Sequence, residues 1–221
     1  MLMGLVNVEQ KDGVATLTLN NPAERNTMTA EMVADISAAM DEIEGDPKVG
    51  ALIVTGAAPA FCAGANLGNL AEADGASLTK IYEGFLRIAA ARAKFDTRFL
   101  QIGLHPGGGH TWMFRNIAGP QATMAAVVFG EILDGVEAER VGLAYKCVPD
   151  DELMTVAHTM ATRAASVPRE LTTLTKRTIQ EMANVATHEQ AVAKELEPQV
   201  WTTRQPWFAE RLAALQSRLK K

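Results

Sequence analysis

Residues 14–19 read Val14-Ala15-Thr16-Leu17-Thr18-Leu19, and the expected fold is built around this stretch. Threonines alternate with apolar residues here, a pattern that is typical of a β-strand. Asp12-Gly13 comes directly before it and follows another apolar run near Val6 and Val8. Because Asp-Gly between two such runs favours a tight hairpin turn, we expect two antiparallel strands joined at this dipeptide.

A helix and a further strand are predicted after this hairpin. Asn20-Asn21-Pro22 ends the strand, and Thr29 can cap a helix that Gly45-Asp46-Pro47 terminates. The apolar positions that repeat at helical spacing in it are Val33, Ile36, Met40 and Ile43. Residues 51–56 then form a short continuous apolar run, as a buried parallel strand requires. Strand, helix and strand together predict a βαβ unit.

The middle of the chain continues with helices and strands. A second helix is predicted after Ser77, and its apolar face consists of Leu78, Ile81, Phe85 and Ile88. Residues 95–99 are typical of a strand that has Asp96 and Arg98 on a solvated face. The remaining expectations are a helix near His110, one between Pro120 and Gly130, one from Glu137 to Gly142 and a strand from Leu143 to Val148.

The C-terminal part is helical in pattern from Asp151 to Lys221, with breaks expected at Pro168, Pro198 and Pro206. We therefore expect an α/β core over residues 1–150 and an all-helical region over residues 151–221. The ββα order of the first half indicates a stacked spiral.

The composition excludes several classes of protein. Of the 221 residues 48% are hydrophobic and 21% are charged, so the chain can bury a core and is not expected to be disordered. A net charge of -5 argues against nucleic-acid binding, since proteins that neutralise phosphates are usually basic. No apolar run predicts a signal peptide or a membrane span. Cys62 and Cys147 show no disulfide or metal-binding pattern, so we expect a cytoplasmic protein.

The first stretch that can carry chemistry is Ala60-Phe61-Cys62-Ala63-Gly64-Ala65-Asn66-Leu67. Its small residues let a ligand approach the backbone, and their N–H groups can donate hydrogen bonds to an oxygen that becomes negatively charged. The same residues also suit a tight turn with a purely structural role. Nothing near Cys62 in the sequence favours a thiolate, so we interpret this residue as a small apolar side chain rather than a nucleophile.

A second stretch, Gly103-Leu104-His105-Pro106-Gly107-Gly108-Gly109, lies before the helix predicted near His110. Glycines in front of a helix can hold an anion or a carbonyl oxygen, although the Gly-Lys-Ser/Thr ending of a nucleotide-binding loop is missing. His105 and His110 have no nearby carboxylate at ligand spacing, so no metal site is predicted.

Four motifs in order resemble those of the crotonase superfamily, the enoyl-CoA hydratase/isomerase proteins that act on acyl-coenzyme A thioesters. Residues 20–26 match the family's Leu-Asn-x-Pro-x-x-x-Asn-Ala pattern, and residues 60–67 are close to Phe-Ser/Cys-Ala-Gly-Ala-Asp-Leu. Residues 95–109 contain Gly-Leu-x-Pro-x-x-Gly at the right distance from the phenylalanine. Residues 137–144 resemble Ala-x-x-Ala-x-x-Gly-Leu-Val.

The resemblance implies a crotonase-like spiral of ββα turns with a helical C-terminal region through which subunits form trimers or hexamers. It also implies that the Ala65 backbone N–H is one of two donors to the thioester oxygen, on which enolate charge develops. The residues implied to bind the substrate or its CoA portion are Arg25, Ala63, Gly64, Ala65, Asn66, Leu104, Pro106 and Gly107. Coenzyme A enters as part of the thioester, and no separate cofactor, metal, nucleic acid or membrane partner is expected.

Two departures from the family pattern concern acid–base chemistry. Hydratases of this family use two glutamates to add water, and the position of one of them is Phe99, which cannot transfer a proton. The other glutamate and the second oxyanion donor belong to a unit of roughly 30 residues that is missing between Ala91 and Lys94. Either the neighbours of this unit close the gap, or the sequence is joined across residues that it does not contain. Because unpaired central strands favour aggregation, we favour the second explanation.

The sequence therefore predicts an acyl-CoA enzyme of the hydratase/isomerase type that stabilises a thioester enolate, although Phe99 argues against hydratase activity. An alternative is a non-hydrating acyl-CoA-binding protein on a crotonase scaffold. A third hypothesis is a structural subunit of a larger assembly, since Trp201, Trp207 and Phe208 are typical of a core or an interface.

Overall fold

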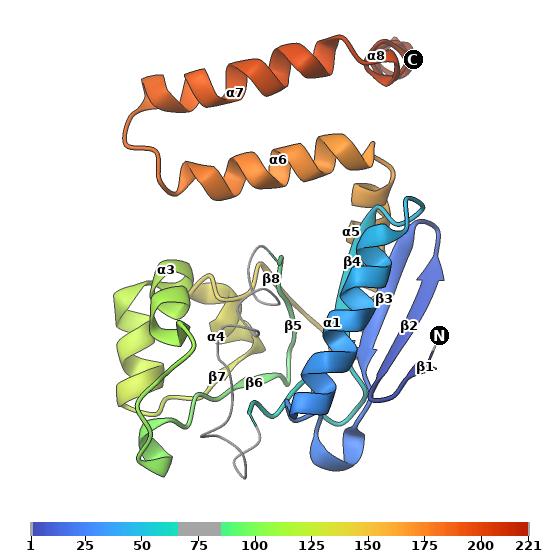
Figure 1. Ribbon diagram of the computed structural model, residues 1–221. Coiled ribbons are helices and arrows are strands. Elements are labelled where there is room, and N and C mark those ends of the chain that lie inside the picture. Colours follow the sequence, from blue (N-terminus) through green and yellow to red (C-terminus); the bar gives the residue numbers. More distant parts are fainter. Residues whose placement is uncertain (1, 66–84, 221) are drawn as a thin grey trace. The chain divides into compact units, whose positions relative to one another are not determined.

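The structure is a computed structural model that describes residues 2–65 and 85–220 (Figure 1). It divides into two compact units, Met1–Thr162 and Arg163–Lys221. Most of the helix predicted after Ser77, and the predicted site residue Asn66, lie outside the described residues.

A four-stranded sheet in the order β1-β2-β3-β4 begins the first unit. The strands β1 (Leu2–Met3), β2 (Val6–Lys11) and β3 (Val14–Leu19) are antiparallel, and β4 (Ala51–Gly56) is parallel to β3. The predicted hairpin is confirmed. Asp12 and Gly13 have φ angles of 53° and 75°, as a two-residue turn of this kind requires.

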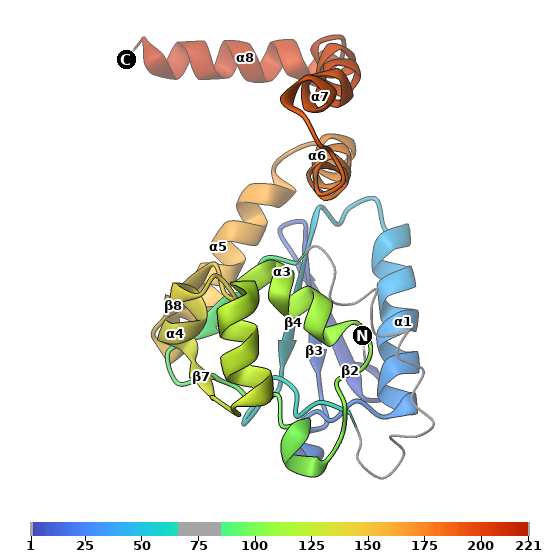
Figure 2. The ribbon, with the colours of Figure 1, turned by 90° about the vertical axis from the view of Figure 1, so that its left-hand side faces the viewer.

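Helix α1 (Ala30–Gly45) connects β3 to β4 and covers one face of the sheet (Figures 1 and 2). The predicted cap is confirmed, because the Thr29 side chain accepts a 3.1 Å hydrogen bond from the Met32 N–H. The helix and the strands bury a common group of apolar residues, which we call the N-terminal cluster. Its buried members are Val6, Ala15, Leu17, Leu19, Met28, Met32, Ile36, Ala39, Ile43 and Val49. The predicted βαβ unit is therefore present.

The described residues in the rest of the first unit form two small sheets and three α-helices. β5 (Ile88–Ala90) pairs in parallel with β8 (Lys146–Val148), and β6 (Lys94–Phe95) pairs antiparallel with β7 (Leu133–Asp134). The helices are α3 (His110–Thr123), which runs into a π-helical turn at Met124–Val128, α4 (Gly135–Arg140) and α5 (Leu153–Ala165). Their buried residues form a central cluster of Ala89, Phe114, Ala126, Leu133, Ala138, Leu143 and Ala144.

Three expectations for this region are wrong in detail. Ile88 begins strand β5 and does not continue a helix, because its backbone pairs with the distant β8. The strand expected over 95–99 ends at Phe95, since Arg98 has a φ of 48° and Phe99 is helical. The strand expected from Leu143 starts only at Lys146. Each of these boundaries depends on pairing with residues that are distant in the sequence. The local sequence pattern contains no information about such pairing.

The N-terminal and central clusters are separate groups of buried residues, although both belong to the first unit. Among the described residues β4 pairs with β3 alone, and all six residues of β4 are only half-buried. A domain usually has one continuous core, and a parallel strand is usually buried between neighbours. The described residues therefore include no layer that joins the two clusters.

The second unit consists of α6 (Arg169–Met182), α7 (His188–Thr203) and α8 (Pro206–Leu219), with α6 and α7 side by side (Figures 1 and 2). Pro168 and Pro206 stand at helix starts as expected, whereas Pro198 lies inside α7 and does not break it. None of these three helices has a buried residue. The described helices include none that combines the length and apolar character needed to cross a membrane.

Candidate functional site

The turns that follow β3 and β4 lie against each other, because the carboxyl ends of two parallel neighbours meet at one edge of the sheet. Two backbone hydrogen bonds join them. The Ala63 N–H donates to the Arg25 carbonyl at 3.0 Å, and the Met28 N–H donates to the Gly64 carbonyl at 2.8 Å. Ala65 is also paired with Met28 in a single parallel bridge. The structure thus brings together Arg25, Ala63, Gly64 and Ala65 from the two motifs.

The backbone N–H groups of this turn differ in whether they are already bonded. The Ala63 N–H donates to Arg25, and the Gly64 N–H contacts the Cys62 sulfur at 3.3 Å. The Ala65 N–H makes no hydrogen bond within residues 2–65 and 85–220. The Ala65 residue is half-buried.

Close backbone packing fixes the path of the chain between β4 and this turn. A Cβ atom placed on Gly56 would lie 2.2 Å from the Phe61 carbonyl oxygen and 2.7 Å from that of Ala60. Only glycine lets the chain fold back so tightly over the end of the strand. The position of the Ala63–Ala65 turn is therefore determined by the end of β4.

Arg25 and Cys62 border the turn and have different electrostatic character. The Arg25 side chain is exposed and makes no ion pair among the described residues, so its positive charge is available to an anion. Cys62 packs against the N-terminal cluster, and burial raises the pKa of its thiol, an effect that the Gly64 N–H partly opposes. The thiol therefore stays protonated, in agreement with its interpretation as an apolar residue.

The second predicted stretch precedes α3. Leu104 and Pro106 are half-buried and Gly107 is exposed, and the Leu104 N–H donates to the Phe99 carbonyl at 2.9 Å. No hydrogen bond or ion pair between described residues joins this stretch to Ala63–Ala65. Leu104, Pro106 and Gly107, which are also predicted to bind the substrate, are therefore not linked to the turn by any bond between described residues.

An aromatic group surrounds the start of α3. The ring of His110 lies 4.9 Å from that of Phe99 and 5.7 Å from that of Phe114, measured between ring centres. Its Nε2 atom is buried and has no hydrogen-bond partner in the part of the chain that the structure describes. Burial lowers the pKa of His110, so the ring is neutral near pH 7.

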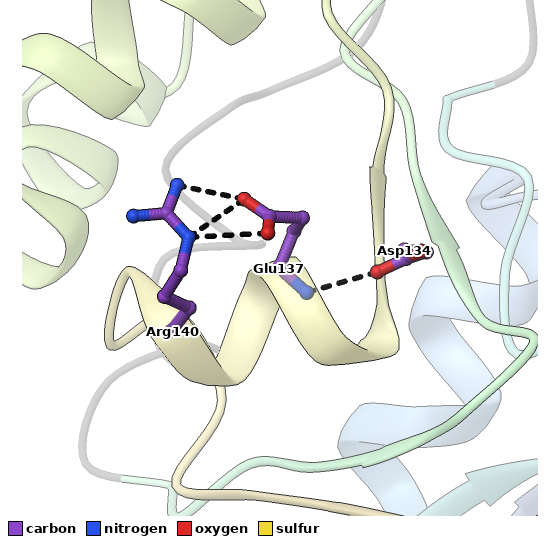
Figure 3. Close-up of polar contacts among 3 residues, drawn as sticks. All are labelled: Asp134, Glu137 and Arg140. Carbon is purple, nitrogen blue, oxygen red and sulfur yellow. Dashed lines mark hydrogen bonds and ion pairs between the residues drawn. The ribbon is translucent and has the colours of Figure 1, made fainter.

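The carboxylates of the fourth motif are already bonded to other groups (Figure 3). Asp134 caps α4 by accepting a 2.8 Å hydrogen bond from the Glu137 N–H, and Arg140 contacts the Glu137 carboxylate at 2.7 Å. The hydrogen bond from Arg140 lowers the pKa of Glu137. Glu139 accepts a 3.0 Å hydrogen bond from the Cys147 N–H. These groups stabilise α4 and β8, and the described residues contain no cluster able to ligate a metal ion.

In the sequence, Asn26 stands out only as part of the motif at residues 20–26, and no role in the site is predicted for it. The structure shows this side chain completely buried and hydrogen-bonded to the segment that leads to Ala63. The available signal was a polar residue that tolerates positive φ within a turn, followed by the apolar Met28. That signal gives no information about the partner, which is more than 30 residues away in the sequence.

Comparison with known proteins relates this site to a family. The Enoyl-CoA hydratase/isomerase family model matches residues 9–86 and 85–214. The probable enoyl-CoA hydratase EchA14 of Mycobacterium tuberculosis is 38% identical over 244 aligned positions, which cover 93% of this chain and 94% of that protein. The chain belongs to the enoyl-CoA hydratase/isomerase family. The 1,2-epoxyphenylacetyl-CoA isomerase of Escherichia coli is 28% identical, with 76% of this chain and 78% of that protein covered.

Solved structures of the enoyl-CoA hydratase/isomerase family have the same fold. The enoyl-CoA hydratase of Bacillus anthracis superimposes with a TM-score of 0.88 at 20% identity, covering 97% of this chain and 96% of that one. A probable enoyl-CoA hydratase/isomerase from Mycobacterium abscessus gives 0.84 at 24% identity, covering 96% and 95%. The predicted crotonase-like α/β fold is confirmed.

The alignments also show where this family member differs from its relatives. The alignment with EchA14 has 244 positions, more than the 221 residues of the chain, so the relative has residues that are missing here. The two stretches that match the family model meet at residues 85–86, shortly before β5. The same region separates the N-terminal cluster from the central cluster.

Proposed function

We propose that this protein binds an acyl-coenzyme A thioester and polarises its carbonyl group with the backbone N–H of Ala65. The observation that carries the proposal is that the Ala65 N–H has no hydrogen bond among the described residues, whereas the N–H groups of Ala63 and Gly64 in the same turn are already used. Hydrogen bonds to the oxygen stabilise the enolate that forms when a proton leaves the α-carbon. Arg25 beside this turn is exposed and has no ion pair with another described residue, so its guanidinium suits the phosphates of coenzyme A.

Difference infrared spectroscopy of a bound acyl-CoA labelled with ¹³C at the thioester carbonyl tests this proposal. We expect calorimetry to detect acyl-CoA binding and the carbonyl stretch to move to lower frequency on binding. Ala65→Pro, which removes the N–H, should abolish this shift, whereas Ala65→Gly should keep it. Loss of one such donor typically reduces a reaction rate on the order of 10²–10³-fold. Binding without any carbonyl shift in the wild type would contradict the role of Ala65.

Isomerase chemistry through the enolate suits the chain better than hydration. Phe99 has no group that can donate or accept a proton, and its ring packs against His110. The carboxylates of Glu137 and Glu139 are bonded to Arg140 and to the Cys147 N–H. We therefore expect bound 2-enoyl-CoA to gain no water, which the absorbance of the conjugated thioester measures. Steady loss of that absorbance with formation of a 3-hydroxyacyl-CoA would show that the protein is a hydratase.

A non-hydrating acyl-CoA-binding protein is the second candidate function, and the same Phe99–His110 contact favours it. The two candidates differ in turnover. Exchange of the α-hydrogens of a bound acyl-CoA for deuterium, followed by mass spectrometry, would identify an enzyme. Binding and a carbonyl shift without exchange or isomerisation would identify a binding protein.

We also propose that the second unit mediates self-association as a trimer or hexamer. Its helices have no buried residues, and several of their large apolar side chains are exposed: Ile179, Val192, Leu196, Leu212, Leu215 and Leu219. Exposed apolar area of this kind usually marks an interface. Light scattering coupled to gel filtration should give a mass of three or six chains, and a monomer at all concentrations would refute the proposal.

A further inference from the structure

The buried amide of Asn26 connects the turn after β3 with the segment after β4. Its side chain is fully buried, at 0% exposure. The Nδ2 group donates hydrogen bonds to the carbonyls of Ala57 at 2.9 Å and Ala60 at 2.7 Å. The Oδ1 atom accepts a 2.8 Å hydrogen bond from the Asn21 N–H. Both N–H groups of the side-chain amide are therefore hydrogen-bonded, and all three partners are backbone atoms.

These bonds continue directly into the two backbone bonds of the candidate site. Residues 57–60 lead into the Ala63–Ala65 turn, where the Ala63 N–H meets the Arg25 carbonyl next to Asn26. Two kinds of contact therefore hold the two turns together. The Asn26 amide binds the carbonyls of Ala57 and Ala60, and backbone hydrogen bonds join Ala63 and Gly64 to the first turn. Any loosening at Ala57 and Ala60 is passed to Ala65, since only a few residues separate them.

We propose that Asn26 is a positioning residue that holds the Ala65 N–H in the orientation needed to polarise the thioester carbonyl. This inference rests on the proposed function of Ala65. A donor contributes to charge stabilisation only when its direction and distance are fixed before the charge develops, and small displacements are costly. Asn26 does not touch the substrate and acts through residues 57–65.

Asparagine suits this place because it meets two requirements together. The backbone of Asn26 has a φ of 56°, a left-handed conformation that asparagine adopts more readily than most residues. Its amide also presents two donors and an acceptor. Aspartate has nearly the same shape but would direct an oxygen towards the Ala57 and Ala60 carbonyls. The pair Asn26 and Asn26→Asp therefore separates hydrogen bonding from packing.

The test compares wild type with Asn26→Asp in two measurements. Backbone hydrogen exchange of residues 57–65 should become faster on the order of tenfold to a hundredfold, because buried hydrogen bonds to two carbonyls are lost. The infrared shift of bound acyl-CoA should largely disappear while the dissociation constant changes less than about threefold, since Arg25 remains in place. If exchange at 57–65 is unchanged, the inference is overturned whatever the ligand does.

Matched variants separate positioning from general loss of stability. Thr27→Val removes a hydrogen bond to the Glu24 carbonyl in the same turn but leaves the Asn26 amide intact, so the infrared shift should be kept. Ile36→Ala weakens the N-terminal cluster without removing any of the hydrogen bonds that Asn26 makes to residues 57–60, and it should lower stability but keep the shift. If Ile36→Ala abolishes the shift as Asn26→Asp does, positioning by Asn26 is refuted.

Three further outcomes are informative. If Asn26→Asp does not fold, Asn26→Gly, which keeps the positive φ without introducing charge, takes its place and should give the same two changes. If wild type binds acyl-CoA without a carbonyl shift, the proposed function of Ala65 is refuted, and Asn26 then has no role in positioning a catalytic N–H. A wild-type shift that survives in Asn26→Asp overturns the positioning role alone.

Discussion

The separation of the N-terminal and central clusters predicts that the two halves of the first unit open independently. Leu17 is the most direct site for a perturbation. It is completely buried in the middle strand β3, where it pairs with Val8 on one side and Val54 on the other. Replacing such a leucine by alanine removes buried methyl groups and leaves a cavity, at a cost of about 3–5 kcal/mol. Leu17→Ala therefore removes a large part of the stability of the N-terminal cluster.

Hydrogen exchange measured by mass spectrometry reports this loss segment by segment. Because each 1.4 kcal/mol is about a factor of ten, exchange in β2, β3 and α1 should become roughly 100-fold to several thousand-fold faster. Exchange in α4 and β5 should change less than about threefold, since Ala138 of α4 and Ala89 of β5 belong to the central cluster. Phe114→Ala is the reciprocal variant and should accelerate exchange in α3, α4 and β5 but not in β2, β3 and α1.

Equal acceleration in all segments would refute this reasoning. It would show that the first unit opens as one cooperative body and that the two clusters are connected energetically. Intact mass adds an independent check on the sequence itself. A species near 23.7 kDa would establish that the chain lacks the expected unit, and one roughly 3 kDa heavier would show that the unit is present.

Three other substitutions test separate features. Gly56→Ala sets a methyl group against the Phe61 carbonyl, so we expect a loss of more than about 2 kcal/mol in thermal melts and weaker acyl-CoA binding; wild-type stability would show that the turn can move. Because burial lowers the pKa of His110, wild type should lose stability as the pH falls below about 6.5, and His110→Phe should lose less; equal pH dependence would contradict this. Asp134→Ala should cost about 1 kcal/mol in urea unfolding through loss of the α4 cap, and Asp134→Ser should restore most of it; failure of serine to do so would exclude capping as the cause.

The N-terminal βαβ unit was predictable because its signals are local. An Asp-Gly turn, a threonine cap and helical spacing of apolar residues each act within a few positions, and the structure confirms all three. Strand β4 was recognised from composition alone. The boundaries that were wrong, at Ile88 and over 95–99, depend on pairing between β5 and β8 and between β6 and β7. Such pairings are not encoded in any short window.

The missing segment shows the same limitation. The expected position of this segment is between Ala91 and Lys94, because Ile88 is assigned to the apolar face of the helix predicted after Ser77. The family model instead begins its second match at residue 85, which assigns β5 to the second stretch. The parallel pairing of β5 with β8 agrees with placing β5 in the second matched stretch.

Part of the candidate site was predictable and part was not. The small residues of the Ala63–Ala65 turn indicate an accessible backbone, and one N–H of this turn has no hydrogen-bond partner within the part of the chain that the structure describes. The role of Asn26 was not predictable, because its partners at Ala57 and Ala60 become neighbours only when β3 and β4 pair in parallel. The aromatic contacts of His110 likewise join residues from a turn and a helix.

The free donor of Ala65 belongs to the main chain, and its side chain is already a single methyl group. An alanine scan would pass over this position unchanged, and most substitutions there would keep the N–H while altering only the space around it. Mutational sensitivity should therefore concentrate on the neighbours that shape the backbone, Gly56 and Asn26, rather than on the reacting group. Mapping such a site requires backbone changes, such as proline or an ester in place of the amide at residue 65.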